Sequence, residues 1–270
     1  MKHSDTAEQR VNLEKAVEKV KCFLRKKLES TGARGYVIGV SGGLDSAVAL
    51  KTTVDAVGPE KVSAWIMPGK PSSRRNMEDA RKLCSDLEVD THEADLTPVV
   101  KSFQKQVNSE PDSKAVGNLR ARIRMCYEYL DANKNQRLVL GSGNRSEYLI
   151  GYFTKYGDGA ADIQPLQQLY KTEIQEIAEK IGLDAKFIEK EPVAGLWKGQ
   201  TDEEEIGADY RTVDKILKNT VDNGLEPEEA AEKTGTDLEK AENIYRMHRD
   251  SKHKRTPADY PELLNRSRES

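Results

Sequence analysis

The sequence predicts an α/β fold in which helices flank a parallel, doubly wound sheet. Short apolar runs alternate with amphipathic stretches along the chain, as expected for consecutive strand–helix units. Two glycine-rich segments, "SGGLDS" and "GSGNRSE", directly follow two of the predicted strands. In such sheets ligands bind beyond the carboxyl ends of the strands, so both segments are candidate binding loops.

The chain begins with a predicted helix. Val17, Val20, Leu24 and Leu28 recur at helical spacing, so roughly the first thirty residues (1–30) form an amphipathic helix. This helix leads into the first predicted strand.

The segment "YVIGVSGGLDSAVAL" (36–50) contains a strand, a glycine-rich turn and the start of a helix. The run from Tyr36 to Val40 is aromatic and β-branched, as buried strands favour, and "AVAL" resumes helical apolar spacing. This order presents unpaired backbone N–H groups and the positive end of a helix dipole to an anion. The alternative is an ordinary turn in which Asp45 or Ser46 caps the helix.

Strands and helices continue to alternate up to the second glycine-rich segment. "KVSAWIMP" (61–68) is a predicted strand that Pro68 ends, and "DTHEADL" is a weaker strand. Between them "RRNMEDARKLCSDLEV" is predicted to be helical, and a long helix follows over about 114–132. "RLVLGSG" (137–143) is a clear strand that ends in glycines.

The rest of the chain is mostly helical. "IQPL" is compatible with a short strand, and "YKTEIQEIAEKIGL" predicts an amphipathic helix that ends at Gly182. Past Glu203 the chain is strongly charged and helical with a break at "NGLEPEE", which predicts a helical C-terminal part over 205–270. We therefore expect one domain over residues 1–270, without internal repeats.

Composition excludes several classes of protein. The 270 residues are 33% charged and 36% hydrophobic, which allows a sizeable core, and the net charge of −3 argues against a nucleic-acid binder. No apolar run is long enough to span a bilayer, and the N-terminus lacks the apolar segment of a signal peptide. We expect a cytoplasmic protein that binds neither membranes nor nucleic acids.

The cysteines and histidines show no metal-binding pattern. Cys22, Cys84 and Cys126 lie far apart without a CxxC pair, and we expect them to be reduced, packed thiols. The four histidines form no spaced zinc signature, so transition-metal chemistry is not expected.

The first glycine-rich loop carries a specific set of functional groups. It lacks the lysine of a Walker A loop, GxxxxGK[ST], and the run "GVSG" (39–42) breaks the register of a Rossmann GxGxxG fingerprint. It offers two glycines, the hydroxyls of Ser41 and Ser46, and the carboxylate of Asp45. Because a carboxylate repels bare phosphate, this combination predicts a phosphate site that also holds a divalent cation.

The loop resembles the SGGxDS loop of the ATP-pyrophosphatase superfamily. Members of this superfamily split ATP between the α- and β-phosphates and adenylate an acceptor. They include NAD, GMP, asparagine and argininosuccinate synthetases and several tRNA-modifying enzymes. The implied fold is adenine-nucleotide α-hydrolase-like, with a Rossmann-like sheet.

The segment "GSGNRSEYLIGYFTKYGDGAADIQPL" (141–166) discriminates among these families. It is similar to the ammonia-dependent NAD synthetase signature, in which G[ST]xxxxE is followed by GxFTKYGDGxxDxxPL. "NLRARIRM", "LYKTE", "AGLWKGQTDEEEIG" and "HKR" match in family order, and "GNRSE" and "AGLW" look more like the archaeal branch. Taken alone, "KYGDG" has the composition of an ordinary turn and "TDEE" has the pattern of a helix capping box. Together and in family order, these segments indicate this family.

The resemblance implies ATP-dependent amidation of deamido-NAD with ammonia to NAD, through an NAD-adenylate, with release of AMP and pyrophosphate. The implied catalytic residues are Asp45, Glu147 and Asp158, of which Asp45 and Glu147 bind Mg²⁺. For Asp158, accepting a proton from ammonium competes with stabilising its own turn. The implied ATP-binding residues are Gly39, Val40, Ser41, Gly42, Gly43, Leu44, Asp45, Ser46, Ser142, Lys171 and Val193, and the implied deamido-NAD-binding residues are Arg122, Lys155, Asp162, His253 and Lys254.

One position departs from the family pattern. Family members usually read P[ST]A where this chain has "PVA", so Val193 lacks the hydroxyl that contacts ATP. The missing hydrogen bond is worth about 0.5–1.5 kcal/mol if nothing replaces it.

The resemblance also implies a nitrogen donor and an assembly. Glutamine-dependent relatives carry an additional amidase domain, for which 270 residues leave no room, so we expect free ammonia unless a separate glutaminase chain docks. Family members of this size are homodimers.

Two alternatives belong to other classes of protein. A tRNA-modifying enzyme with the same loop would usually carry reactive cysteines or a basic extension. A non-catalytic nucleotide-binding sensor would not need Asp45 and Glu147 together.

Overall fold

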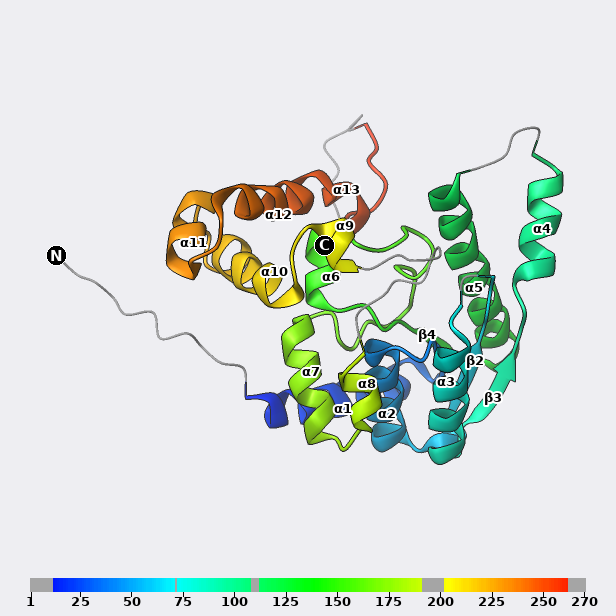
Figure 1. Cartoon of the computed structure of the whole chain (residues 1–270). Coiled ribbons are helices and arrows are strands. Elements are labelled where there is room, and N and C mark those ends of the chain that lie inside the picture. The colour runs from blue at the N-terminus through cyan, green and yellow to red at the C-terminus, as the bar shows by residue number, and fades with distance from the viewer. Residues whose placement is uncertain (1–11, 71, 108–111, 191–201, 262–270) are drawn as a thin grey trace.

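The computed structural model describes residues 12–70, 72–107, 112–190 and 202–261. Within them, four parallel strands form one sheet in the order β3-β2-β1-β4 (Figure 1). The strands are β1 (Tyr36–Gly39), β2 (Val62–Ile66), β3 (Asp90–Glu93) and β4 (Leu138–Leu140). The predicted parallel α/β fold is confirmed.

The central strand β1 is apolar along its length because both of its faces are covered. Tyr36 and Ile38 are buried in the main core, and the Tyr36 hydroxyl donates to the carbonyl of Leu24 at 2.7 Å. Val37, between them, is buried in a separate cluster with Ala132. Successive strand residues face opposite sides of a sheet, so these two clusters lie on opposite faces.

Helices cover both faces of the sheet. The main core contains residues of the sheet and of α1 (Leu13–Thr31), α2 (Leu44–Val57), α3 (Arg74–Asp86), α7 (Lys171–Lys180) and α8 (Ala185–Ile188). On the other face, α5 (Ser113–Asn135) packs on β1 and β4, and α4 (Thr97–Lys105) packs on α5. This arrangement leaves the carboxyl ends of β1 and β4 side by side.

The C-terminal helices form a second core beside the sheet. α10 (Tyr210–Leu217), α11 (Pro227–Thr234) and α12 (Leu238–Asp250) pack on one another and lie apart from the strands in Figure 1. Their core includes Leu149 and Ile150 of α6 (Arg145–Ile150), so this region holds α6 in place. The remaining short elements are a 3₁₀ turn (Pro59–Lys61), α9 (Asp202–Ile206), a π-helical turn (Lys218–Asp222) and α13 (Lys252–Arg255).

One expected strand is absent from the described part of the chain. "IQPL" makes only an isolated parallel bridge between Ile163 and Leu140, so the interpretation of this stretch as a strand is wrong. Pro165 has no N–H to donate, which prevents the pairing from extending. The short helices α4 and α6 were not expected from the sequence.

The cysteines are free, but the expectation that all three are packed is wrong. Cys84 is buried, whereas Cys22 and Cys126 are exposed on α1 and α5. Both helices bury one face only, and these two thiols lie on the faces that remain open. None of the helices in the described ranges has the length and apolar character that crossing a bilayer requires.

Candidate active site

The turn between β1 and α2 forms the first wall of the site. β1 ends at Gly39, and α2 begins at Leu44 after the Gly43 N-cap. In the described structure no side chain caps this helix. The first N–H groups of α2 are therefore available to an anion, as the sequence predicts.

Two serine hydroxyls hold this phosphate loop, residues 41–46, in shape. The Ser46 hydroxyl donates to the Gly43 carbonyl at 3.0 Å and accepts from the Ser41 N–H at 3.3 Å. The Gly43 N–H donates to the Ser41 hydroxyl at 3.2 Å. The two predicted phosphate contacts thus also stabilise the loop internally.

Glycine is required at two positions of this turn. Gly42 has a φ of +78°, and a Cβ there would overlap the carbonyl oxygen of Asn76 on α3. A Cβ at Gly39 would overlap the Glu128 carboxylate on α5. The loop is therefore in direct contact with both neighbouring helices.

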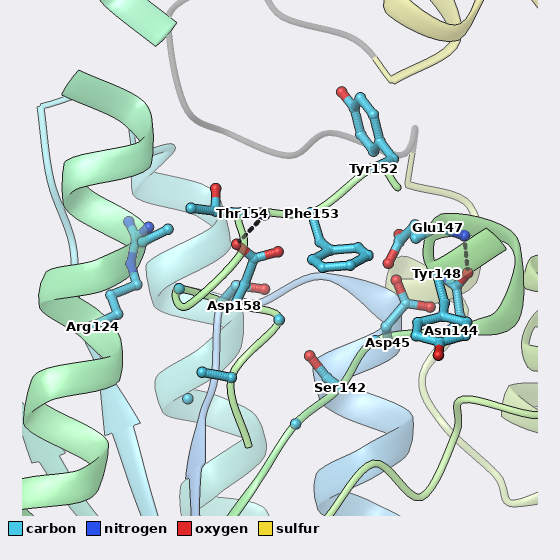
Figure 2. A pocket seen from close by; sticks show the side chains of 18 of the residues that line it. Asp45, Arg124, Ser142, Asn144, Glu147, Tyr148, Tyr152, Phe153, Thr154 and Asp158 are labelled. Atoms are coloured by element: carbon cyan, nitrogen blue, oxygen red, sulfur yellow. Dashed lines mark hydrogen bonds between the residues drawn. The ribbon is translucent and has the colours of Figure 1, made fainter. Parts of the chain in front are cut away.

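The second wall follows β4. Asn144, fully buried, is the N-cap of α6, and its Oδ1 accepts from the Glu147 N–H at 2.9 Å (Figure 2). This cap fixes Glu147 in the first turn of α6, directly beyond the strand. Ser142 lies on the preceding segment and lines the same cavity.

A buried carboxylate joins the helices that carry the site. Asp214 of α10 accepts from the Thr172 N–H at 2.9 Å and from the Thr172 hydroxyl at 2.8 Å. It also accepts from the Ser146 hydroxyl, which in turn accepts from the Lys171 N–H at 2.9 Å. These bonds fix α6, α7 and α10 relative to one another.

Lys171 lies between the two carboxylates predicted to bind a metal. Its Nζ forms an ion pair with Asp45 Oδ2 and lies 3.9 Å from Glu147 Oε1, and its side chain is only 5% exposed. Figure 2 shows Asp45 from α2 and Glu147 from α6 pointing toward one another. The structure thus brings together three predicted site residues that are distant in sequence.

The charges of this group depend on one another. Burial raises the pKa of Glu147 well above its ordinary value, and the neighbouring charge of Asp45 raises it further. Burial alone would lower the pKa of Lys171, but the charges of Asp45 and Glu147 outweigh it and raise the pKa of Lys171. The two carboxylates therefore favour any cation placed between them.

The site fits a divalent cation. Asp45 Oδ1 is buried and has no hydrogen-bond partner among the described residues, which leaves one hard oxygen donor unused. The described residues contain no cluster of three or more His, Cys, Asp or Glu side chains placed to hold a metal. Mg²⁺ commonly takes one or two carboxylates together with substrate phosphates, so two carboxylates beside a phosphate loop are sufficient.

The "KYGDG" turn forms the opposite side of the cavity. Asp158 Oδ1 accepts from the Thr154 N–H at 3.0 Å, so the carboxylate does stabilise its own turn. The side chain also lines the cavity, across from Asp45 and on the side of Arg124 (Figure 2). Burial among protein atoms raises the pKa of Asp158, although the Thr154 N–H opposes the shift.

Most of the predicted acceptor-binding residues line one cavity of about 1580 Å³ together with the phosphate loop. The exception is Asp162, which lies outside the lining and accepts from the Val139 N–H at 2.8 Å. Lys254 Nζ donates to the carbonyls of Gly151 and Phe153, at 2.6 and 2.9 Å.

Two further residues that the sequence predicts to bind deamido-NAD donate hydrogen bonds to backbone carbonyls. Arg122 donates to the Lys155 carbonyl at 3.3 Å, and the Lys155 ammonium donates to the His253 carbonyl. Val193 lies outside the described residues.

Two contacts at the site join segments that sequence reasoning did not connect. The Tyr210 hydroxyl lies 3.2 Å from Asp202 Oδ2 and 3.5 Å from Glu147 Oε1, so "TDEE" contributes more than a capping box. Glu128 of α5 lies against Gly39, and burial raises its pKa to about 8 while the Arg124 charge opposes the shift. Glu128 belongs to no quoted motif, and the role of Asp202 within "TDEE" becomes visible only through its pairing with Tyr210.

Comparison with known proteins identifies the family. Residues 16–258 match the model of a family described as NAD synthase. The chain is 46% identical over 248 residues to the NH(3)-dependent NAD(+) synthetase of Thermococcus kodakarensis, covering 92% of this chain and 97% of that protein.

Two solved structures share the fold over nearly their whole length. The NMN synthetase from Francisella tularensis has a TM-score of 0.83 at 34% identity, with 93% of this chain and 99% of that chain covered. The NH3-dependent NAD synthetase from Campylobacter jejuni has a TM-score of 0.79 at 29% identity, with the same coverage.

The raised pKa of Glu128 predicts a pH-dependent stability. The unfolded chain loses this proton near the ordinary value of 4.5, whereas the folded chain keeps it up to about 8, so stability falls as the pH rises between these values. Glu128→Gln, which stays neutral, should raise Tm by about 3 °C or more at pH 8 and change it little at pH 4.5. Thermal unfolding across this pH range is the measurement.

Glu176→Gln, on the exposed side of α7, is the control and should shift Tm equally at all pH values. A constant Tm difference for Glu128→Gln would contradict the assignment.

Proposed function

The chain belongs to the NAD synthase family, and from this membership we infer that it converts deamido-NAD, ATP and ammonia to NAD, AMP and pyrophosphate. One observation supports the proposed roles of the residues. Asp45, Lys171 and Glu147 lie together beside the uncapped N-terminus of α2. An adenylating enzyme needs charge neutralisation and positioning at this point.

The first half-reaction takes place at the phosphate loop. A carboxylate oxygen of deamido-NAD attacks the α-phosphorus of ATP, the bond to the β-phosphate breaks, and pyrophosphate leaves. We propose that the N–H groups from Leu44 to Ser46 receive the phosphates and that Lys171 neutralises developing charge. Ser142, on the adjacent strand end, is the proposed further ATP contact.

We propose that Asp45 and Glu147 hold Mg²⁺ when ATP binds. The ion would neutralise phosphate charge and favour departure of pyrophosphate. Lys171 occupies the space between the two carboxylates without ATP. The proposed Mg²⁺ site requires both acidic residues, whereas a nucleotide sensor would not.

The second half-reaction takes place toward the "KYGDG" turn. Ammonium loses one proton to become ammonia, ammonia attacks the acyl carbon of the adenylate, AMP leaves with its phosphate oxygen, and the new amide nitrogen loses a second proton to water. Asp158 lines the cavity opposite Asp45, and we propose that it binds ammonium by charge and takes the first of these protons. Its bond to Thr154 is compatible with this role because only one carboxylate oxygen is used.

We further propose that Arg122, Lys155, His253 and Lys254, which line the cavity, bind the deamido-NAD acceptor. His253 and Lys254 lie on α13, and Lys155 lies on the "KYGDG" turn. We propose that Asp162 supports substrate binding indirectly, because it holds the backbone of β4 in place and does not line the cavity. We propose a cytoplasmic homodimer, as the family resemblance implies. Analytical ultracentrifugation tests the dimer directly.

The reaction itself is testable with purified protein. Deamido-NAD, ATP, Mg²⁺ and ammonium should give NAD and pyrophosphate in equal amounts, and glutamine should not replace ammonium. The likeness to an NMN synthetase makes the acidic mononucleotide a second candidate acceptor, so both acceptors are compared by kcat/KM. A higher kcat/KM for the mononucleotide would reassign the acceptor, and equal rates with glutamine would refute the nitrogen donor.

The shared metal site predicts non-additive losses. Asp45→Asn and Glu147→Gln should each keep the fold and slow pyrophosphate release by roughly 100-fold or more, because a neutral amide holds Mg²⁺ poorly. The double variant should lose little more than either single one, since both residues serve one ion. Pyrophosphate release over a range of Mg²⁺ concentrations is the measurement.

Asp55→Asn, elsewhere on α2 in an ion pair with Lys51, is the matched control and should behave as the unmodified chain. Additive losses in the double variant would argue against a single shared ion.

The proposed role of Asp158 separates the two half-reactions. Asp158→Asn keeps the acceptor for the Thr154 N–H but removes the charge, so adenylate formation should persist while amidation slows by roughly tenfold or more. Amidation should recover partly as the pH rises and free NH₃ increases. Each half-reaction is assayed separately, by pyrophosphate release and by NAD formation. A parallel fall of both with a lower Tm would assign Asp158 to the turn alone.

A further inference from the structure

A lysine outside every recognised motif contacts the phosphate loop. Lys190 follows α8, and its Nζ lies 2.8 Å from the Gly42 carbonyl and 2.6 Å from Asp79 Oδ2 on α3. Its side chain is 15% exposed and lines the same cavity as the loop. Three segments that are distant in sequence therefore meet at one loop carbonyl.

The position of this carbonyl determines the direction of the next N–H. A trans peptide is planar, so a fixed Gly42 carbonyl directs the Gly43 N–H to the opposite side, where it donates to the Ser41 hydroxyl. Gly42 is held from the other side by its contact with Asn76 of α3. Lys190 therefore completes the set of contacts that orient the Gly42–Gly43 peptide.

Ion pairs hold Lys190 in place beside the loop. Lys186 Nζ lies 3.2 Å from Asp79 Oδ1, so two ammonium groups share one carboxylate. Burial opposes ionisation of Asp79, but hydrogen bonds from Lys190 and Lys186 outweigh it and lower the pKa of Asp79. Lys186 also pairs with Asp184 Oδ2 at 3.7 Å, and of the two lysines only Lys190 bonds to the loop.

We propose that Lys190 is a positioning residue for ATP: through the Gly42 carbonyl it holds the phosphate loop in the orientation that receives the triphosphate, and Asp79 holds Lys190. The proposal rests on the function above, which places ATP phosphates on this loop. It concerns ATP because the contact of Lys190 is with the phosphate loop, and no hydrogen bond joins Lys190 to the described residues proposed to bind deamido-NAD.

The test compares Lys190→Met with Lys186→Met. The two lysines are closely matched, since both pair with Asp79 and lie 5.3 and 5.2 Å from the Phe187 ring centre, but only Lys190 bonds to the loop. Lys190→Met should raise the KM for ATP by about tenfold or more, as expected for loss of a charge-assisted hydrogen bond, and change the KM for deamido-NAD less than about twofold. Lys186→Met should change neither by more than about twofold. Lys190→Arg, which can still donate to both oxygens, should restore part of the loss.

Calorimetry of ATP binding, in the absence of deamido-NAD, distinguishes a failure of this inference from a failure of the proposed function. If the unmodified chain binds ATP and Lys190→Met binds it equally tightly, the inference is wrong while the proposed function stands. If the unmodified chain binds no ATP, the proposed function itself fails. Equal losses in the two methionine variants, or equal rises in both KM values, would show that the Asp79 ion pairs act only on the fold.

Discussion

The arrangement of the site depends on a buried lysine between two carboxylates. Lys171 pairs with Asp45 and lies near Glu147, and these residues come from the first turns of α7, α2 and α6. Burial and the charge of Asp45 raise the pKa of Glu147, and the charge of Lys171 opposes this shift. Lys171 thus places a positive charge between the two carboxylates proposed to bind a metal.

The fold brings these helix ends together by simple means. β1 and β4 are neighbouring parallel strands, and each turns at its carboxyl end into a helix that begins with an acidic residue in its first turn. Asp214 of the C-terminal helices then bonds to Ser146 and Thr172, which fixes α6 against α7. The second core is therefore part of the active site, although it lies apart from the sheet.

Local sequence predicted much of this arrangement, because local chemistry determines it. The β-branched run before "SGGLDS" and the "RLVLGSG" run gave the correct strands, and the two carboxylates proposed to bind Mg²⁺ lie in the helices that follow them. The bond from Lys190 to Gly42, the contact of Glu128 with Gly39 and the backbone bonds of Lys254 join segments far apart in the chain. No periodicity or turn signal encodes such pairings. "IQPL" failed as a strand for a local reason, since Pro165 stops the pairing that its apolar neighbours favour.

The most direct test of the central claim is a crystal structure of the chain with Mg²⁺ and a non-hydrolysable ATP analogue. We predict one Mg²⁺ bound by an oxygen of Asp45, an oxygen of Glu147 and a phosphate oxygen, each at about 2.0–2.1 Å. Lys171 Nζ should have left Asp45 for a phosphate oxygen. A metal held by phosphates and water alone, with Lys171 still paired to Asp45, would contradict the account.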